Sequence, residues 1–345
     1  MVSSKLKKLL YFYLIIATTG CYLVNQAYEQ NSLMNSRSPI SEVVGKGEDQ
    51  WLVERLRYVR DVIEFAKNNG LNTKNAYEYY VHLDRDSISY LVYAAQANSL
   101  ESYTWWFPIV GEVPYLGFFD SKERDEVAND LASEGYDISK GNVGAFSSLG
   151  WFEDPIYSSM LKRGDASLAH LLFHELTHRT FWSSGSTRFN ENLAEFIAGK
   201  LTEAYLLEKK EYKLLKKYQQ RKDDRILYKE WLSRLKSSLV ALYSSGASLE
   251  EMKRRKEEVF DSALKDLPSF SSGYENYIRR REWNNAAVLS SSLYSPDFSL
   301  FEKSYSCISA DGVGEYLQML RFAESEAGDS FSALTYLCSH KEIPR

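Results

Sequence analysis

Two short motifs and the segment that joins them place the strongest constraint on how this chain can fold. The first motif is His174-Glu175-Leu176-Thr177-His178, and the second is Asn190-Glu191-Asn192-Leu193-Ala194-Glu195. Residues four apart in a helix lie on one face, about one turn from each other, so both histidine rings can face a single point. Between the motifs, Ser183-Ser184-Gly185-Ser186-Thr187 is typical of a turn. We therefore expect two helices packed side by side, with Glu191 brought back towards the histidines.

The residue types in these motifs indicate a zinc site. A catalytic zinc site has three protein ligands and keeps a fourth position open for water. We predict that His174, His178 and Glu191 hold one zinc ion per chain. Glu175 points roughly a third of a turn away, so it is placed to act as a general base on water rather than to bind the metal. The first motif alone also occurs by chance in many proteins, and the second motif makes the prediction specific.

Two further residues are expected to support the ligands. Glu195 lies four residues after Glu191 on the same helix face, where its carboxylate can accept the free ring N–H of a ligand histidine. His170 lies one turn before His174 and is more typical of a supporting or packing residue than of a ligand. Together the motifs resemble those of the gluzincins, the thermolysin-like zinc peptidases whose third ligand is a glutamate.

Composition agrees with a globular enzyme and excludes one class of partner. The chain has 345 residues, of which 44% are hydrophobic and 26% are charged. This length corresponds to about two domains, or to one large enzyme domain with an insertion. The net charge is -5, and the sequence has no basic run, zinc ribbon or RNA-binding motif. Nucleic acid is therefore not an expected partner.

The N-terminal residues have the pattern of an export signal. Lysines among the first eight residues precede an apolar stretch, Leu9 to Ala17, and Thr18-Thr19-Gly20-Cys21 follows. The small residue before the cysteine resembles a bacterial lipobox, which predicts a signal peptide over residues 1–20 and lipidation of Cys21. The alternative is another export signal or an uncleaved anchor, although the stretch is shorter than the roughly twenty residues of a membrane span. We expect a protein of the bacterial cell envelope, periplasmic or surface-exposed, whose lipid anchor binds the membrane.

The remaining cysteines leave two possibilities open. If Cys21 carries lipid, Cys307 and Cys338 form a pair that an oxidising compartment can join in a disulfide. Two buried free thiols are equally compatible with the sequence. Neither cysteine has the spacing of a metal ligand.

Hydrophobic periodicity predicts a mixed N-terminal half. Residues 22–50 are polar and are expected to be a tether, followed by a catalytic core over 51–200. Within the core, helices are expected over 51–69, where Gly70 ends the pattern, and over 122–134. Short strands are expected within 77–97, 105–108 and 113–119.

A further strand is expected over 143–152, which ends 22 residues before His174. Gluzincins place a substrate-binding edge strand at about this distance from the motif, and such a strand can extend an incoming peptide by backbone hydrogen bonding. Under this hypothesis Ala145, Phe146 and Ser147 bind substrate. The alternative is an ordinary core strand.

The C-terminal half is expected to be helical. Residues 201–267 predict a helical hairpin, with one long charged helix over 201–242 and a second helix over 249–267 that starts with a capping-box pattern. Its default role is a structural arm, and the alternatives are a cap over the active site or a partner-binding surface. Residues 268–345 are expected to complete the active site. The predicted fold class is α+β, predominantly helical, with a zincin-like core, a small edge sheet and an inserted long helical hairpin.

Motifs spread over most of the mature chain resemble the bacterial putative aminopeptidase family of predicted zinc lipoproteins. Besides the zinc motifs, they are Tyr80-Val81-His82-Leu83-Asp84-Arg85, Trp106-Phe107-Pro108-Ile109-Val110-Gly111, Gly117-Phe118-Phe119-Asp120, Ser147-Ser148-Leu149-Gly150-Trp151-Phe152-Glu153-Asp154-Pro155 and Trp283-Asn284-Asn285-Ala286. The resemblance implies peptide hydrolysis, with Zn²⁺ as the cofactor and a peptide as the substrate.

Zinc peptidase chemistry suggests roles for residues outside the motifs. Glu175 would take a proton from water and deliver it to the leaving amine. The tetrahedral oxyanion needs a donor besides the metal, and Tyr294 is the candidate, the alternative being a tyrosine that packs a surface. Glu153 or Asp154 could bind the substrate ammonium group of an aminopeptidase, while Asp154-Pro155 could equally form a turn.

Three classes of function fit these observations. The first is a zinc metallopeptidase, in particular an aminopeptidase. The second is a zinc hydrolase of another amide, such as a cell-wall peptide. The third is a surface lipoprotein that keeps the metal site but works as a non-catalytic binding module, which would bind zinc without turning over any peptide.

Overall fold

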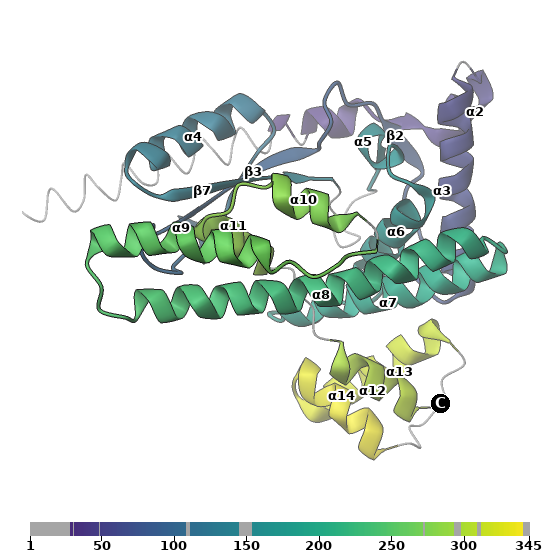
Figure 1. Cartoon of the computed structure of the whole chain (residues 1–345). Coiled ribbons are helices and arrows are strands. Elements are labelled where there is room, and N and C mark those ends of the chain that lie inside the picture. Colours follow the sequence, from purple (N-terminus) through teal and green to yellow (C-terminus); the bar gives the residue numbers. More distant parts are fainter. Residues whose placement is uncertain are drawn as a thin grey trace, which may run out of the picture.

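The protein is built mainly from helices, with three small sheets (Figure 1). The computed structural model describes residues 28–29, 31–47, 49–107, 111–144, 154–271, 273–292, 298–308 and 312–340. Over these ranges, the prediction of a predominantly helical α+β chain is confirmed. In the same part of the chain, no helix is both long and apolar enough to span a membrane.

Helix α3 (Gln50–Asn68) lies where the sequence predicts a helix. The side chain of Asp49 accepts a hydrogen bond from the Leu52 N–H, which satisfies one free donor of the first turn. Gly70 follows the helix with φ at 85°, a conformation that glycine adopts without a steric penalty. Gly70 therefore ends the helical segment, as expected, because it adopts this backbone conformation.

Part of the expected tether is folded. β1 (Ser38–Pro39) and α2 (Ile40–Lys46) both lie within the range 22–50. The side chain of Ile40 is buried in the main hydrophobic core, and its N–H donates a hydrogen bond to the carbonyl of Glu78. These contacts attach the end of this range to the body of the protein.

The strands form three separate sheets. Their orders are β1, β2 (Tyr79–Val81) and β8 (Ile156–Tyr157); β6 (Leu116–Phe118), β3 (Ser89–Ala95) and β7 (Asp137–Val143); and β4 (Trp105–Phe107) with β5 (Gly111–Val113). Only the pairing of β2 with β8 is parallel among the described strands. Helices α4 (Ser121–Ser133) and α11 (Asn285–Ser292) pack against β3 and β7.

β7 is the edge strand that borders the candidate site. Among the described strands it pairs with β3 alone, which leaves its other edge free of a neighbouring strand. Its residues Lys140, Gly141 and Asn142 have low strand propensity, and seven residue pairs with β3 hold them extended. The strand expected over 143–152 overlaps β7 only at Val143, and residues 145–153 lie outside the described residues.

The two motif helices are α6 (Asp165–Thr180), preceded by α5 (Ser158–Leu161), and α7 (Thr187–Glu208), and α6 packs along α7. Buried Asn190 fixes the turn between them. Its side-chain oxygen accepts from the Ser183 N–H at 2.9 Å, and its amide nitrogen donates to the Ser183 carbonyl at 2.7 Å. The Ser183 hydroxyl in turn lies 2.5 Å from that of Ser330.

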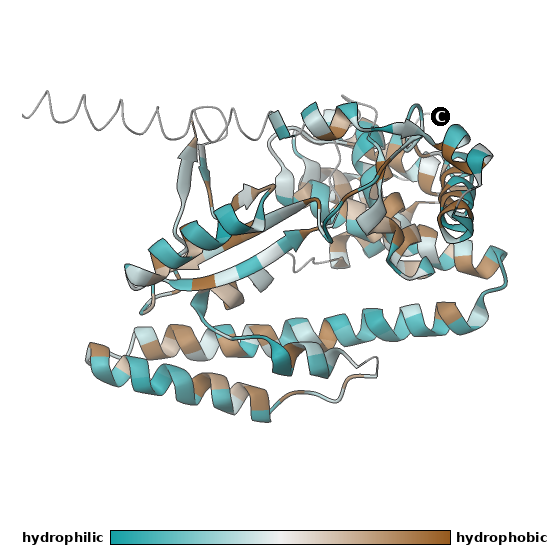
Figure 2. Cartoon of the chain, turned by 90° about the horizontal axis from the view of Figure 1, so that it is seen from above, coloured by the Kyte–Doolittle hydropathy of each residue, from teal (hydrophilic) through white to brown (hydrophobic). Residues whose placement is uncertain are grey.

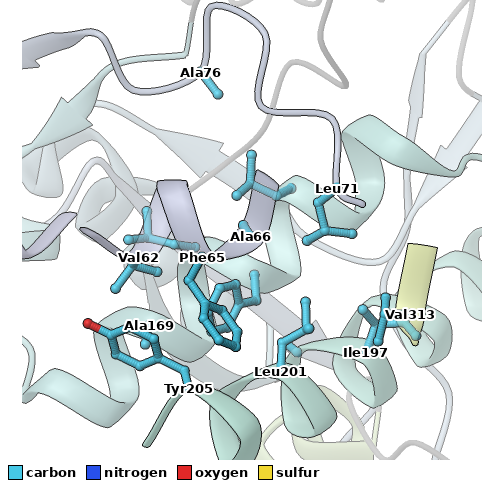
Figure 3. Close-up of a cluster of buried hydrophobic side chains, with 14 of the residues drawn as sticks. Val62, Phe65, Ala66, Leu71, Ala76, Ala169, Ile197, Leu201, Tyr205 and Val313 are labelled. Carbon is cyan, nitrogen blue, oxygen red and sulfur yellow. The ribbon is translucent and has the colours of Figure 1, made fainter. Parts of the chain in front are cut away.

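The main hydrophobic core joins α3, α6 and α7 (Figure 3). Val62 and Phe65 come from α3, Ala169 from α6, and Leu201 and Tyr205 from α7. The rings of Phe65 and Tyr205 meet edge to face with centroids 5.2 Å apart. Because full burial of one large apolar side chain stabilises a fold by roughly 1.5–3 kcal/mol, this cluster makes a rigid base for the motif helices.

The predicted hairpin consists of α8 (Tyr212–Tyr243) and α9 (Leu249–Lys265), but it starts later than expected. The single helix predicted over 201–242 is wrong, because α7 ends at Glu208 and Lys210 turns the chain with φ at 59°. One half of the capping pattern is confirmed, since the Ser248 hydroxyl accepts from the Glu251 N–H at 3.3 Å, whereas the Glu251 carboxylate pairs with Arg254.

Hydrophilic and hydrophobic residues alternate along α8 and α9 (Figure 2). The buried residues of these helices form a second core with two residues from the C-terminal part. Its members are Tyr228, Trp231, Leu232, Leu235, Leu239, Phe260, Ile278 and Val288. The hairpin is therefore packed on one side and solvated on the other.

The C-terminal part adds α10 (Tyr274–Arg280), α12 (Ser299–Cys307), α13 (Val313–Ala327) and α14 (Ser330–Ser339). Cys307 and Cys338 form a disulfide between α12 and α14, with their Cα atoms 5.0 Å apart. Of the two possibilities that the sequence left open, the structure contains the disulfide.

We predict that Gly314→Ala destabilises the protein by about 1–3 kcal/mol, the usual range for overpacking. A Cβ at this position in α13 would lie 2.9 Å from the Cα of Gly70 and 3.2 Å from the carbonyl oxygen of Asn69. Alanine otherwise favours a helix over glycine, so a loss would isolate the steric effect. Urea denaturation of the variant and the wild type measures the difference.

Gly45→Ala is the matched control. Gly45 also lies in a helix, and a Cβ there would meet no atom within 4 Å. We expect this variant to be as stable as the wild type or slightly more stable. Equal stabilities for Gly314→Ala and Gly45→Ala would contradict the close approach of α13 to Gly70.

Candidate metal centre and active site

The structure brings together the three residues that the sequence assigns as metal ligands. The Nε2 atoms of His174 and His178 lie 3.2 Å apart. Oε2 of Glu191 lies 3.4 Å from Nε2 of His174, and its Oε1 lies 3.4 Å from Nε2 of His178. The His178 side chain is 6% exposed and that of Glu191 is 41% exposed. The group is therefore closed on the histidine side and open beside the carboxylate.

These separations fit a tetrahedral ion. A tetrahedron with metal–ligand distances of about 2.0–2.1 Å has edges of roughly 3.3–3.4 Å, which is close to the separation of the two nitrogens and to that of each nitrogen from one Glu191 oxygen. Atoms that carry lone pairs and converge this closely repel one another unless a cation or a proton lies between them. Two imidazole nitrogens and one carboxylate oxygen are a donor set that suits zinc.

A second group of potential ligands, His170, His174 and Glu195, also clusters. It is less suited to a cation, because Glu195 forms an ion pair with the guanidinium of Arg225. A metal ion there would meet that positive charge directly. The first group is therefore the better metal site.

Glu195 instead links the ligand histidine to its surroundings. Its Oε2 lies 3.6 Å from Nδ1 of His174 and 2.9 Å from Nε2 of His170. The other ring nitrogen of His170 lies 2.7 Å from the hydroxyl of Tyr218. A carboxylate beside Nδ1 favours a proton on that nitrogen, which leaves Nε2 of His174 free to bind a metal.

The protonation of His170 follows from its burial. Burial, followed by the positive charge of Arg225, lowers the pKa of His170 to about 3, so its ring is neutral at ordinary pH. A neutral ring donates one hydrogen bond and accepts one. Nε2 therefore donates to the Glu195 carboxylate, and Nδ1 accepts from the Tyr218 hydroxyl. Each polar atom of this network has a complementary partner.

Two carboxylates in the site have pKa values that move in opposite directions. Burial raises the pKa of Glu175, and the charges of His174 and His178 offset only part of that effect. Burial would also raise the pKa of Glu191, but hydrogen bonds from the two histidines outweigh it and hold that pKa well below the usual range. Such a divergence is typical of an ionised ligand beside a proton-carrying acid or base.

The other predicted site residues fare differently. Asp154 is buried, and its Oδ2 accepts from Nη1 of Arg179 at 3.0 Å, so this carboxylate already has a cationic partner. The remaining assigned residues lie outside the described residues, namely Cys21, Ala145, Phe146, Ser147, Glu153 and Tyr294.

Tyr218 and Arg225, which both lie on α8, are site residues that the sequence did not indicate. The sequence predicts only a long charged helix through the run from Arg221 to Arg225. In the structure Arg225 pairs with Glu195, and Asp224 is buried, where its side chain accepts from the Ser271 N–H at 2.9 Å. A buried aspartate in a charged helix has no signature in a single sequence.

Tyr77 is a further residue near the site that sequence reasoning missed. It is buried, and its φ of 57° lies in the left-handed region, which is rare for a bulky residue. Its N–H donates to the carbonyl of Asp154 at 3.0 Å. Burial raises the pKa of its phenol, and the nearby charge of Glu175 adds to that effect. Tyr77 therefore stays neutral in the electrostatic surroundings of Glu175.

A large cavity lies one helical turn from the metal ligands. It has a volume of about 850 Å³, within the range of small-molecule sites. His170 and Glu195 form part of its wall, and residues 139–142 of the edge strand β7 form another part. The cavity thus lies between the sheet edge and the motif helices.

Comparison with known proteins finds one family. A family model described as putative aminopeptidase matches residues 21–327, which is most of the chain. No curated protein and no solved structure matches the chain.

We predict that the purified protein contains about one zinc ion per chain and that Glu191→Ala loses most of it. Removal of one of three protein ligands leaves only the two histidines to hold the ion. Inductively coupled plasma mass spectrometry measures the metal content of both proteins.

Glu208→Ala serves as the control, since Glu208 is an exposed glutamate at the end of the same helix. This variant should keep its zinc. Full zinc occupancy in Glu191→Ala would show that the third ligand lies elsewhere.

Proposed function

We propose that this chain, which belongs to the putative aminopeptidase family, is a zinc metallopeptidase of the gluzincin type and acts as an aminopeptidase. The observation that carries the proposal is the convergence of His174, His178 and Glu191 at separations of 3.2–3.4 Å. The family match supports peptidase activity, and the donor set supports zinc in a zincin-like core.

The three ligands would hold one zinc ion and leave a fourth position open. Bound zinc supplies a Lewis acid that activates water and polarises a carbonyl group. Glu175 follows His174 directly and is buried. In the proposed reaction its carboxylate takes a proton from the attacking water and passes it to the amine that leaves. Its raised pKa suits a group that must hold a proton between these two steps.

The network behind His174 would keep that ligand in place during turnover. Glu195 fixes the ring through Nδ1, while His170 and Arg225 hold the Glu195 carboxylate from two sides. Tyr218 completes the chain of hydrogen bonds. Such partners orient a ligand and raise its basicity, so they act as positioning residues.

The edge strand would bind the peptide. β7 has an edge without a neighbouring described strand, and a peptide could add to it by backbone hydrogen bonds. We propose that Ala145, Phe146 and Ser147 continue this interaction towards the metal and that Tyr294 donates to the oxyanion. For the substrate ammonium group, Glu153 is the better candidate, because Asp154 is already paired with Arg179.

The proposal includes a place in the cell. The N-terminal pattern supports an export signal over residues 1–20 and a lipid anchor on Cys21, with the enzyme domain outside the cytoplasm. The disulfide between Cys307 and Cys338 supports an oxidising compartment. The membrane would then be a partner of the mature chain through its lipid, and the peptide its substrate.

We predict that Glu175→Gln lowers kcat/KM on a free peptide by at least about a hundredfold and leaves the zinc content unchanged. Glutamine has the same shape but cannot accept the proton, and general-base catalysis contributes about 10²–10⁴-fold. Hydrolysis of tetra-alanine, followed by amine release, measures the rate.

Two comparisons make this test decisive. Glu208→Gln changes an exposed glutamate of α7 in the same way and should retain full activity. An N-acetylated tetra-alanine should resist the wild type if the enzyme needs a free ammonium group. Equal rates for Glu175→Gln and the wild type would refute the proposed mechanism.

A further inference from the structure

The cavity beside His170 and Glu195 is strongly cationic. Among the described residues, seven lysine and arginine side chains line it, against two carboxylates. Four of the cations pair with a carboxylate, in the pairs Lys140–Asp125, Lys200–Glu302, Lys222–Glu203 and Arg225–Glu195. The remaining lining cations include Arg280 and Arg281, at the end of α10.

Arg281 is the lining cation that most clearly indicates an anion site. Its guanidinium donates to the hydroxyls of Ser139, Ser290 and Ser291 at 2.7–3.3 Å and to the carbonyl of Ala287 at 3.3 Å. The acceptor in each of these hydrogen bonds from Arg281 to a described residue is thus a neutral oxygen. A half-buried guanidinium in this state is held in place, yet its charge is not neutralised by those contacts. A carboxylate suits this guanidinium, because the N–H groups on Nε and Nη1 that these bonds do not use can donate a charge-assisted hydrogen bond to it.

The rest of the wall suits an organic anion rather than an inorganic one. Aromatic side chains line the cavity beside the arginines, among them Tyr93, Tyr228 and Tyr274. Burial raises the pKa values of Tyr228 and Tyr274, so both phenols stay neutral and add no negative charge. The cavity therefore offers apolar contact area together with positive charge.

The cavity borders two elements of the proposed active site, the helix that carries Glu195 and the edge strand β7. Glu195 forms part of its wall and lies 3.6 Å from the metal ligand His174. The edge strand β7 runs along it through residues 139–142. A peptide bound along the β7 edge at residues 139–142 would therefore contact the cavity.

We propose that this cavity binds a carboxylate of the peptide substrate, in the first place its free C-terminus, through Arg280 and Arg281. The inference rests on the proposed peptidase function and specifies its substrate class as short peptides that end in a free carboxylate. An acidic side chain downstream of the scissile bond offers the same chemistry and is the second source of the anion.

The test measures binding directly, in the zinc-loaded Glu175→Gln full chain, by isothermal titration calorimetry. The probes are tetra-alanine with a free C-terminus, its C-terminal amide, and the amide of Ala-Ala-Asp-Ala. The free acid should bind at least about tenfold more tightly than the amide, as expected for one charge-assisted contact. Recovery of tight binding by the aspartate amide would extend the site to acidic side chains, and weak binding would restrict it to the C-terminus. Equal affinities for all three probes would overturn the proposal.

Variants on α10 locate the contact. Arg280→Gln, added to the Glu175→Gln chain, should reduce the preference for the acid by about tenfold. Arg279→Gln on the same helix removes the same charge, but Arg279 pairs with Glu275 and does not line the cavity, so this variant should keep the preference. Arg281→Lys keeps the positive charge but lacks the planar guanidinium. This variant replaces Arg281→Gln if that protein fails to fold. An unchanged acid preference in both Arg280→Gln and Arg281→Lys would refute the assignment.

The two proposals fail separately. Selective binding of the acid without hydrolysis by the wild-type chain would remove the peptidase function and leave an anion site. Hydrolysis by the wild type, together with equal affinities for the acid and the amide, would refute the carboxylate site and leave the peptidase function standing.

Discussion

The candidate site depends first on how the turn between α6 and α7 is closed. Asn190 is buried and exchanges two hydrogen bonds with the backbone of Ser183. A buried amide without partners costs about 1–3 kcal/mol, so these bonds strongly disfavour other turn geometries. Glu191 is the next residue in the chain, and its carboxylate must approach two histidines on another helix. Together with the core between the two helices, the Asn190 side chain therefore sets their register and the separation of the three candidate ligand atoms.

Negative and positive side chains are separated over a short distance beside the candidate metal ligands. Glu191 and Glu195 concentrate negative charge around His174, whereas the neighbouring cavity is cationic. Arg225 lies at the boundary, where its pairing with Glu195 limits the effect of the cavity's positive charge on the metal site. Its half-buried position strengthens this pairing relative to one at the surface, because water screens it less. The same carboxylate thus supports the ligand on one side and closes the cavity on the other.

Much of the fold could be read from the sequence where the physical signal is local. The helices α3, α4 and α9 have strong periodicity and caps, and the convergence of His174, His178 and Glu191 follows from helical spacing and the turn between two helices. The signal was absent where tertiary contacts override local preference. β7 contains Lys140, Gly141 and Asn142, and only its ladder with β3 makes it a strand. The break at Lys210 occurs in a charged run that favours a helix, and the burial of Asp224 depends on a loop 47 residues away.

The last helix, α14, contacts the turn between the two motif helices. The hydroxyl of Ser330, at the start of α14, meets that of Ser183 in the turn that carries Asn190. The disulfide fastens α14 to α12, while the family match ends before α14 begins, at residue 327. Helix α14, which lies outside the matched region, thus supports the turn that places Glu191 beside the two histidines. A chain without α14 would keep both motifs but would hold Glu191 less firmly beside the two histidines.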